Sequence, residues 1–270
     1  MTLTFTKMNG AGNDFVVLDN RALELALTRE QIARLCDRNR GVGADGLLAV
    51  EPAEDGADFK FRYYNADGGE AEMCGNGARC YARFAASLLE EPKEELSFET
   101  IAGTLQARLV GEEVCIWMSP PFDLQMDAPV ALPGLPSPVH HLNTGVPHAV
   151  VFVEDVAGTD ILTHGAALRF HEHFQPNGAN ANFAEILSPD HLSVRTYERG
   201  VENETLACGT GITACALIHH LLTGQESPVK ITVRGGDVLS IGFTPDEAQQ
   251  FSQVTLTGPA DFVFTGQITL

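Results

Sequence analysis

Residues 61–80 read FRYYNADGGEAEMCGNGARC, and residues 194–215 read VRTYERGVENETLACGTGITAC. The two stretches share arginine, tyrosine and Cys-Gly-x-Gly positions in the same order. The offset is 133 residues at the arginines (195 − 62) and 134 at the cysteines (208 − 74), so one residue is inserted between them. A chain that repeats itself in this way is expected to fold as two similar halves, each with a Cys-Gly-x-Gly turn. The matched positions are Arg62 with Arg195, Tyr64 with Tyr197, Cys74 with Cys208, Gly75 with Gly209, and Gly77 with Gly211.

The size of the chain suits two domains. Its 270 residues would divide into halves of about 130, within the usual ~100–200 residues per domain. Hydrophobic residues make up 44% of the chain and charged residues 20%, as in ordinary globular proteins. The 17 basic and 36 acidic residues give a formal charge of −19, which would repel nucleic acid and anionic membranes. We therefore expect no nucleic-acid or membrane partner, and any basic group that binds an anionic ligand should lie in a pocket.

The six cysteines are expected to be thiols. No apolar run approaches the ~20 residues of a membrane span, and the N-terminal MTLTFTKM alternates like a strand and not like a signal peptide. These features predict a cytoplasmic protein, in which cysteines stay reduced. The cysteine spacings do not resemble a zinc site, and no metal is expected. His171 and His173 lie two residues apart, as on one face of a strand, and are not expected to bind metal either.

Periodicity predicts the elements of the first half. Thr28-x-x-Gln31 is a capping box that should start a helix, and the apolar residues after Cys74 recur at helical spacing. Six of the fourteen prolines lie in residues 119–138, which we interpret as a linker between the domains. Strands are expected at Leu3–Lys7, Phe15–Asp19, Gly46–Val50, Asp58–Tyr64, Leu96–Thr100, Gly103–Leu109 and Val114–Met118.

The second half is expected to repeat this order. A helix near Asp160–Leu168 and another after Cys208 should accompany strands at His148–Val153, Asn182–Leu187, Leu192–Tyr197, Val229–Val233, Val238–Phe243 and Gln253–Thr257. Phe262–Leu270 is expected to pair back on the first domain. The predicted fold is α+β with two pseudo-symmetric domains, each a mixed, largely antiparallel sheet wrapped around a central helix that begins at the cysteine turn. The domains would be 1–118, completed by 258–270, and 119–257.

Each repeated cysteine is expected where a loop turns into a helix. The first turn of a helix has N–H groups without intrahelical acceptors and carries the positive end of the helix dipole. A cysteine there is acidified from a pKa of ~8.5 toward ~3.5–7.5, so thiolate is available near neutral pH. The adjacent glycines allow close backbone approach and leave N–H groups to bind a carboxylate. Either cysteine alone would fit an inert buried residue equally well, but their repetition favours chemistry.

Two such turns facing each other predict a two-base reaction at one carbon. A thiolate on one face would remove an α-proton and a thiol on the other face would return one, which inverts the stereocentre. Helix termini and N–H groups would stabilise the developing negative charge, so no cofactor is expected. The chain has no GxxxxGK[ST] motif, and GVGADG at 41–46 lacks a clear preceding strand. The other cysteines, at 36, 80, 115 and 215, lie in apolar patterns and are expected in the core.

These motifs together resemble the diaminopimelate epimerase family. The resemblance covers nearly the whole chain and is carried by Met73-Cys-Gly-Asn-Gly-Ala-Arg-Cys80, Asn9-Gly-Ala-Gly-Asn13-Asp14-Phe, Asn65-Ala-Asp-Gly, Gly145-Val-Pro-His148, Arg195-x-Tyr-Glu-Arg-Gly and Ala207-Cys-Gly-Thr-Gly211. It implies cofactor-independent interconversion of LL- and meso-2,6-diaminopimelate, on the bacterial route to lysine and peptidoglycan. It also implies two domains that close over the substrate, and a homodimer.

The resemblance implies a role for each matching residue. Cys74 and Cys208 would be the acid/base thiols, and His148 and Glu198 would tune them. The reacting carboxylate would be held by the backbone of Gly75, Asn76, Gly209 and Thr210. Substrate would be recognised by Asn13, Asn65, Asn180, Glu198 and Arg199. An arginine fork suits a distal carboxylate, and a glutamate suits an ammonium group.

The chain departs from the family pattern at two positions. Some members carry Gln where Gly46 stands and Asn where Val146 stands, and both side chains can contact substrate there. Backbone, water or a neighbouring side chain must supply those contacts in this chain.

Other functions remain open at this point. A proline or hydroxyproline racemase of the same fold would typically carry His after Cys-Gly, where this chain has Asn76, and would leave Glu198 and Arg199 without a distal group. A sister isomerase type keeps the fold but lacks the cysteine pair. A non-catalytic protein that closes on an amino acid would have no need of two matched thiols.

Overall fold

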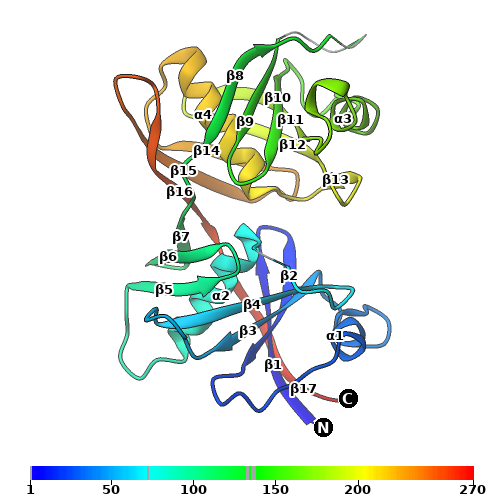
Figure 1. Ribbon diagram of the computed structural model, residues 1–270, viewed down its shortest axis with the longest axis vertical. Coiled ribbons are helices and arrows are strands. Elements are labelled where there is room, and N and C mark those ends of the chain that lie inside the picture. Colours follow the sequence, from blue (N-terminus) through cyan, green and yellow to red (C-terminus); the bar gives the residue numbers. More distant parts are fainter. Residues whose placement is uncertain (1, 72, 132–133, 135–137) are drawn as a thin grey trace. The chain divides into compact units, whose positions relative to one another are not determined.

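The computed structural model describes residues 2–71, 73–131, 134 and 138–270. The chain separates into two compact units. Unit 1 runs to Trp117 and includes Gly258–Leu270, and unit 2 is Met118–Thr257. Figure 1 shows that each unit contains strands and helices of its own.

Unit 1 is a mixed sheet with two helices. Its elements are β1 (Thr2–Gly10), β2 (Asn13–Asp19), α1 (Arg29–Cys36), β3 (Gly46–Glu51), β4 (Phe59–Asn65), α2 (Gly75–Ser87), β5 (Glu95–Thr100), β6 (Gly103–Val110), β7 (Glu113–Trp117) and β17 (Asp261–Thr269). The strands pair in the order β17-β1-β2-β3-β4-β5-β6-β7, and β2–β3 and β4–β5 are the parallel pairs. Helix α2 contacts β1, β2 and β3 and also β7, so strands surround it (Figure 1).

Unit 2 has the same plan. Its elements are β8 (Phe122–Ala128), β9 (Val139–Asn143), β10 (Pro147–Phe152), α3 (Ile161–Arg169), a 3₁₀ turn η1 (Glu172–Phe174), β11 (Asn180–Ser188), β12 (His191–Glu198), β13 (Asn203–Thr205), α4 (Gly209–Thr223), β14 (Val229–Val233), β15 (Val238–Pro245) and β16 (Phe251–Pro259). The strands pair in the order β8-β9-β10-β11-β12-β14-β15-β16, with β13 on β12, and β10–β11 and β12–β14 are the parallel pairs.

The two units repeat each other strand by strand. Strands β9, β10, β11, β12, β14, β15 and β16 follow one another with the same parallel and antiparallel pairings as β1 to β7. An additional strand lies beside the first one in each unit, β17 beside β1 and β8 beside β9. This repetition confirms the fold predicted from the duplicated motif. The C-terminal strand β17 pairs with β1.

Each sheet packs its apolar side chains against helices. The capping box at Thr28 is present at the start of α1, whose Ile32 and Leu35 join the core over β1 to β3. In α2, the buried Tyr81 ring lies 4.8 Å from Phe61 and 5.0 Å from Phe98, measured between ring centroids. Helix α4 is buried over most of its length because its residues are largely apolar around the whole circumference.

Two expectations from sequence need correction. Residues 119–138 are not only a linker, because Phe122–Ala128 forms β8 and pairs with β9. The alternation in FDLQMDA indicates a strand, but the prolines on both sides obscured it. Positions 133 and 136 lie outside the described residues.

His171 and His173 lie at a 3₁₀ turn and not on a strand, since His171 caps the turn by accepting a hydrogen bond from the His173 N–H. Strands β9 and β13 were not predicted.

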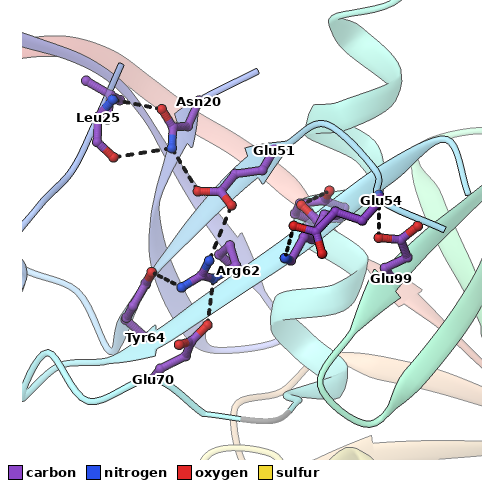
Figure 2. Close-up of polar contacts among 10 residues, drawn as sticks. Asn20, Leu25, Glu51, Glu54, Arg62, Tyr64, Glu70 and Glu99 are labelled. Atoms are coloured by element: carbon purple, nitrogen blue, oxygen red, sulfur yellow. Dashed lines mark hydrogen bonds and ion pairs between the residues drawn. The ribbon is translucent and has the colours of Figure 1, made fainter. Parts of the chain in front are cut away.

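The repeated arginines each hold the segment that leads to a cysteine turn. Arg62 Nε donates to Glu70 Oε1 at 2.6 Å, and Arg195 Nε donates to Glu204 Oε1 at the same distance. Each glutamate stands four residues before its cysteine. Figure 2 shows that Arg62 also contacts Glu51 and the Tyr64 hydroxyl.

The two ion pairs differ in burial, and this difference gives a test. The Glu204 side chain is 5% exposed and also meets Arg234, whereas that of Glu70 is 35% exposed. Glu204→Gln should lower the free energy of unfolding by about 3 kcal/mol, because it leaves Arg195 without its buried anion. Glu70→Gln should lower it by less than about 1 kcal/mol. Urea unfolding measures both, and Glu112→Gln, at a 93% exposed side chain, is the control. Equal losses for the two repeat glutamates would contradict this interpretation.

Candidate active site

Both repeated cysteines are the N-cap residues of their helices. Cys74 precedes α2 with φ −139° and ψ 121°, and Cys208 precedes α4 with φ −124° and ψ 103°. The first helical bonds are accepted by the cysteine carbonyls, from Ala78 N–H at 2.7 Å and Ile212 N–H at 3.0 Å. The N–H groups of the three residues after each cysteine therefore lie in the first turn, where a helix offers no acceptor. Each thiol lies at the positive end of a helix dipole, as predicted.

Packing requires a glycine at the last position of the Cys208-Gly-x-Gly211 motif. A Cβ at Gly211 would lie 2.2 Å from Asn182 Oδ1 and 3.3 Å from Cys208 Sγ. The same atom at Gly77 would meet its nearest neighbours at 3.4 Å, on Leu48 and Phe15. The first turn of α4 thus lies directly against the polar side chain of Asn182, which the sequence did not single out.

In unit 1 the structure brings Asn13 and Asn76 together. Asn76 is buried and its Nδ2 donates to Asn13 Oδ1 at 2.7 Å. Asn13 Nδ2 in turn donates to Asp45 Oδ2 at 2.9 Å. Asp45 also accepts from Arg38, so a charged pair anchors the asparagine chain at its far end. Gly75 lies beside these residues as the first residue of α2.

Tyr63 occupies the space that a side chain at position 46 would need. A Cβ at Gly46 would lie 2.6 Å from the Tyr64 carbonyl oxygen and 2.8 Å from Tyr63 Cε2. Gly46 pairs with Asn65 across the β3–β4 ladder, and the Tyr63 hydroxyl donates to Asn65 Oδ1 at 2.9 Å. The phenol therefore orients Asn65, the predicted substrate residue at the end of β4. The absence of a side chain at Gly46 thus leaves room for the Tyr63 ring.

In unit 2 the buried His148 is held by Asn182. Asn182 Nδ2 donates to the Ala149 carbonyl at 3.0 Å, and its Oδ1 accepts from the Thr196 hydroxyl at 2.9 Å. A carbonyl can only accept, so this contact fixes which way the amide points. The same Nδ2 lies 3.1 Å from His148 Nδ1, which must then be the accepting nitrogen. The neutral ring consequently carries its proton on Nε2.

His148 is expected to tune the thiols, and its surroundings bear on whether it could do so by charge or by hydrogen bonding. Its side chain is fully buried, and burial, with the positive Arg199 and the nearby His141, lowers the pKa of His148 to about 3. His148 is thus neutral at physiological pH. It can act on a thiol or a substrate only as an Nε2–H donor, and among the described residues Nε2 has no hydrogen-bond partner.

The other predicted residues of unit 2 lie around the end of β12. Asn180 is buried, donates to the Pro147 carbonyl at 3.3 Å and accepts from the Arg199 N–H at 2.7 Å, so it fixes the backbone at Arg199. Arg199 Nη1 reaches the Asn177 carbonyl at 3.2 Å. Glu198 ends β12, and burial raises the pKa of its carboxyl.

Thr210 lies beside the thiol of unit 2. Its Oγ1 is 3.6 Å from Cys208 Sγ, and its carbonyl accepts from the Thr144 hydroxyl at 2.8 Å. Thr144 precedes Gly145 and the half-buried Val146, so the β9–β10 turn lies against the first turn of α4 next to Gly209.

The same scaffold carries different chemistry in the two units. In the matched registers His148, Asn182 and Thr196 of unit 2 occupy the places of Phe15, Leu48 and Tyr63 in unit 1. A buried polar network thus lies beneath the Cys208 turn, and largely aromatic and aliphatic side chains lie beneath the Cys74 turn. Sequence analysis missed Asn182, Thr196 and Tyr63, although alignment of the repeats beyond the cysteine turns would have shown the exchange.

The remaining cysteines belong to the core, as predicted. Burial raises the pKa of the Cys36 thiol to about 11 and that of Cys80 to about 12, and it raises the pKa of Cys215 further still. Cys115 is also buried. In the part of the chain that the structure describes, no three His, Cys, Asp or Glu side chains gather as a metal site would require. None of the described helices has the length and apolar character needed to span a membrane.

Comparison with known proteins gives one consistent result. A family model described as diaminopimelate epimerase matches residues 5–121 and 141–263. The chain is 42% identical to the diaminopimelate epimerase of Aquifex aeolicus, covering 99% of this chain and 98% of that protein. It is 43% identical to the diaminopimelate epimerase of Chlorobaculum tepidum, covering 97% and 100%.

Solved structures of lower identity share the fold. A PhzF-family phenazine biosynthesis protein of Bacillus anthracis matches with a TM-score of 0.75 at 19% identity, over 100% of both chains. A hydroxyproline epimerase of Agrobacterium vitis matches with a TM-score of 0.73 at 17% identity, over 99% of this chain and 92% of that one.

The bonding of His148 predicts its titration. Long-range ¹H–¹⁵N spectra should show the neutral tautomer with its proton on Nε2 throughout pH 5–9. Because the folded protein binds this proton more weakly than the unfolded chain, His148 stabilises the fold above about pH 6.5. As the pH is lowered from about 6.5 toward 3, this contribution to the free energy of unfolding is lost, by up to about 1.4 kcal/mol per pH unit. Asn182→Leu introduces the residue that unit 1 has at the matching position, Leu48. It should remove the hydrogen bond to His148 Nδ1, so that both neutral tautomers become populated. An imidazolium signal at pH 6–7 in the unsubstituted protein would contradict the assignment.

Proposed function

Since the chain belongs to the diaminopimelate epimerase family, we propose that it interconverts LL- and meso-2,6-diaminopimelate without a cofactor, with Cys74 and Cys208 as its two acid/base groups. The observation that carries this proposal is that the two thiols cap the two matched helices of a duplicated fold. The family match over 5–121 and 141–263 includes both cysteine turns and supports the choice of substrate.

The reaction needs one thiolate and one thiol at the same α-carbon, one on each face. The thiolate takes the α-proton, so the C–H bond breaks and its electron pair stays on the carbon. The opposite thiol then gives its proton to that carbon from the other face. The product has the inverted configuration, and the two sulfur atoms have exchanged their protonation states. No electron acceptor and no net proton are required.

The helix N-termini would stabilise the charge that develops. N–H groups of Gly75, Asn76, Gly209 and Thr210 lie in first turns and suit the carboxylate of the reacting end. A carboxylate held by such donors accepts electron density from the α-carbon as the proton leaves, because the donors are already aligned. Asn13, whose amide is tied to Asn76, extends this set of donors.

The distal end of the substrate would be recognised at the end of β12. Arg199 offers a planar fork for the distal carboxylate, and Glu198 offers a carboxylate for the distal ammonium. Asn180 fixes the backbone at Arg199, and Asn65 is oriented by Tyr63. His148 would serve as a neutral donor near Cys208, and Glu198 would influence the same thiol by its charge.

The racemase and binding alternatives are less well supported. A compact proline-like substrate would leave Glu198 and Arg199 without a partner, and the fold likeness to a hydroxyproline epimerase is at 17% identity. A binding protein would have no use for two thiols at helix N-caps.

The first test follows the α-proton. In deuterium oxide, proton NMR of LL-diaminopimelate with the reduced protein and no added cofactor should show loss of the α-proton signal and appearance of the meso isomer. Cys74→Ala and Cys208→Ala should each lower epimerisation by at least about 10³-fold, because each removes one of the two proton carriers.

The control separates loss of a base from loss of the fold. Cys36→Ala and Cys115→Ala remove buried thiols that belong to neither Cys-Gly-x-Gly turn and should retain activity. Substantial turnover by either Cys74→Ala or Cys208→Ala would rule out the two-base mechanism, and exchange with proline alone would assign a racemase.

We further propose a homodimer in the cytoplasm, where both thiols would stay reduced. Support for self-association comes from β17, where the consecutive Phe262, Val263 and Phe264 are 46%, 56% and 49% exposed. Contiguous exposed apolar residues of this kind mark protein interfaces.

Self-association through β17 is tested by charge. Val263→Glu should shift the protein from dimer to monomer in analytical ultracentrifugation, because it places a carboxylate in the exposed apolar segment of β17. Leu162→Glu, at a similarly exposed apolar residue of α3 (54%), should leave the dimer intact. A dimer unaffected by Val263→Glu would place the interface elsewhere.

A further inference from the structure

Arg79 is a fully buried arginine in the helix that begins at Cys74. Its exposure is 0%, and it heads the largest completely buried side chains of the described residues. A buried guanidinium is costly unless its N–H groups are hydrogen-bonded. What it bonds therefore indicates why it is there.

Its hydrogen bonds reach directly into the proposed site. Nη2 donates to Asn76 Oδ1 at 2.8 Å, and Nη1 donates to the Gly75 carbonyl at 3.4 Å. Nε donates to the Pro259 carbonyl at 3.2 Å, on the segment that returns to unit 1. Two of these acceptors belong to the two residues that follow Cys74.

These contacts determine how two asparagines face the ligand. A guanidinium only donates, so the Asn76 oxygen must point to Arg79 and the Asn76 amide nitrogen to Asn13. A carboxylate only accepts, so the Asn13 nitrogen must point to Asp45. Both amide oxygens are thereby engaged inside the protein. What remains on Asn13 and Asn76 for a ligand is N–H donors, which suit a carboxylate.

The repeat shows that the fold itself does not require a cation here. The position matching Arg79 in unit 2 is Thr213, at the offset of 134 residues (213 − 79) found at the cysteines. Thr213 is also 0% exposed, and its hydroxyl donates to the Gly209 carbonyl at 2.9 Å. Gly209 is the counterpart of Gly75, so Arg79 and Thr213 each donate to the equivalent backbone carbonyl of their own turn. Only unit 1 adds a positive charge and a bond to the following residue.

We propose that Arg79 is a positioning residue of the Cys74 turn: it turns the N–H groups of Asn76 and Asn13 toward the substrate carboxylate and places a buried positive charge beneath the thiolate of Cys74. This inference rests on the function proposed above. The bond from Nη1 to the Gly75 carbonyl places the guanidinium beside the residue that follows Cys74. The turn at Cys208 has a helix dipole and a neutral His148 instead.

The test compares Arg79→Gln, Arg79→Lys and Arg83→Gln. Arg83 lies one turn later on α2 and donates to the Ala260 carbonyl at 2.9 Å, so it anchors the same returning segment without touching an asparagine. Circular dichroism and thermal melting first establish that each variant is folded. The pH dependence of iodoacetamide labelling at Cys74, read by peptide mass spectrometry of the reduced protein, then reports thiolate formation without any substrate.

Arg79→Gln should move the labelling midpoint upward by about one pH unit, because a nearby positive charge favours the thiolate. It should also raise KM and lower kcat/KM at least about tenfold. Arg79→Lys should keep the labelling midpoint of the unsubstituted protein but show the raised KM of Arg79→Gln, since an ammonium keeps the charge and loses the planar fork. Arg83→Gln should change neither.

The outcomes separate this inference from the proposed function. A folded Arg79→Gln with unchanged labelling and unchanged KM would overturn the inference, and so would equal effects of Arg79→Gln and Arg83→Gln. If Arg79→Gln does not fold, Arg79→Lys decides between the outcomes: an unchanged labelling midpoint with a raised KM supports the inference, and an unchanged KM overturns it. A shifted midpoint in a protein that does not epimerise diaminopimelate would support the charge effect and reject the proposed substrate instead.

Discussion

The start of a helix at a cysteine is the constraint from which the rest of the site follows. A helix N-terminus offers aligned N–H groups and positive potential, but only if its first turn can approach the sheet and the ligand closely. Glycines after each cysteine make this approach possible, and at Gly211 a single added carbon would collide with Asn182. The Arg62–Glu70 and Arg195–Glu204 pairs then hold the segments that enter the two turns. The position of each thiol, and the anion binding and thiolate stabilisation proposed for it, thus depend on one backbone arrangement.

Duplication supplied that arrangement twice, and the side chains beneath it have since diverged. Under Cys208 lie a neutral histidine, an asparagine and a threonine joined by hydrogen bonds. Under Cys74 the matching positions hold Phe15, Leu48 and Tyr63, and the polar contacts come from the helix itself through Arg79 and Asn76. A substrate with one reacting end and one distal end has no two-fold symmetry about its α-carbon. Two chemically unequal halves on equal backbones suit such a ligand.

Much of the fold could be predicted because its signals are local or repeated. Helical spacing after Cys74, the capping box at Thr28 and the repeat itself predicted the helices and the plan of each unit, and the structure confirms them. Strand β8 was missed because flanking prolines obscured a clear alternation. The family was recognised from its motifs and is confirmed by the relatives. The roles assigned to single site residues stay predictions. The neutral state of His148 and the contacts of Tyr63 and Arg79 depend on packing between strands and helices that no local pattern encodes.

Unit 1 is assembled from two distant parts of the chain, and this has a consequence for its synthesis. Strand β17 pairs with β1 along nearly its whole length, from Thr2 opposite Thr269 to Asn9 opposite Asp261. On the ribosome β1 therefore emerges well before its partner β17. All of Met118–Thr257 emerges in between and has the opportunity to fold while its neighbour is still incomplete. Unit 1 therefore cannot be completed before β17 has left the ribosome, so chains truncated before Asp261 would lack the strand that pairs with β1.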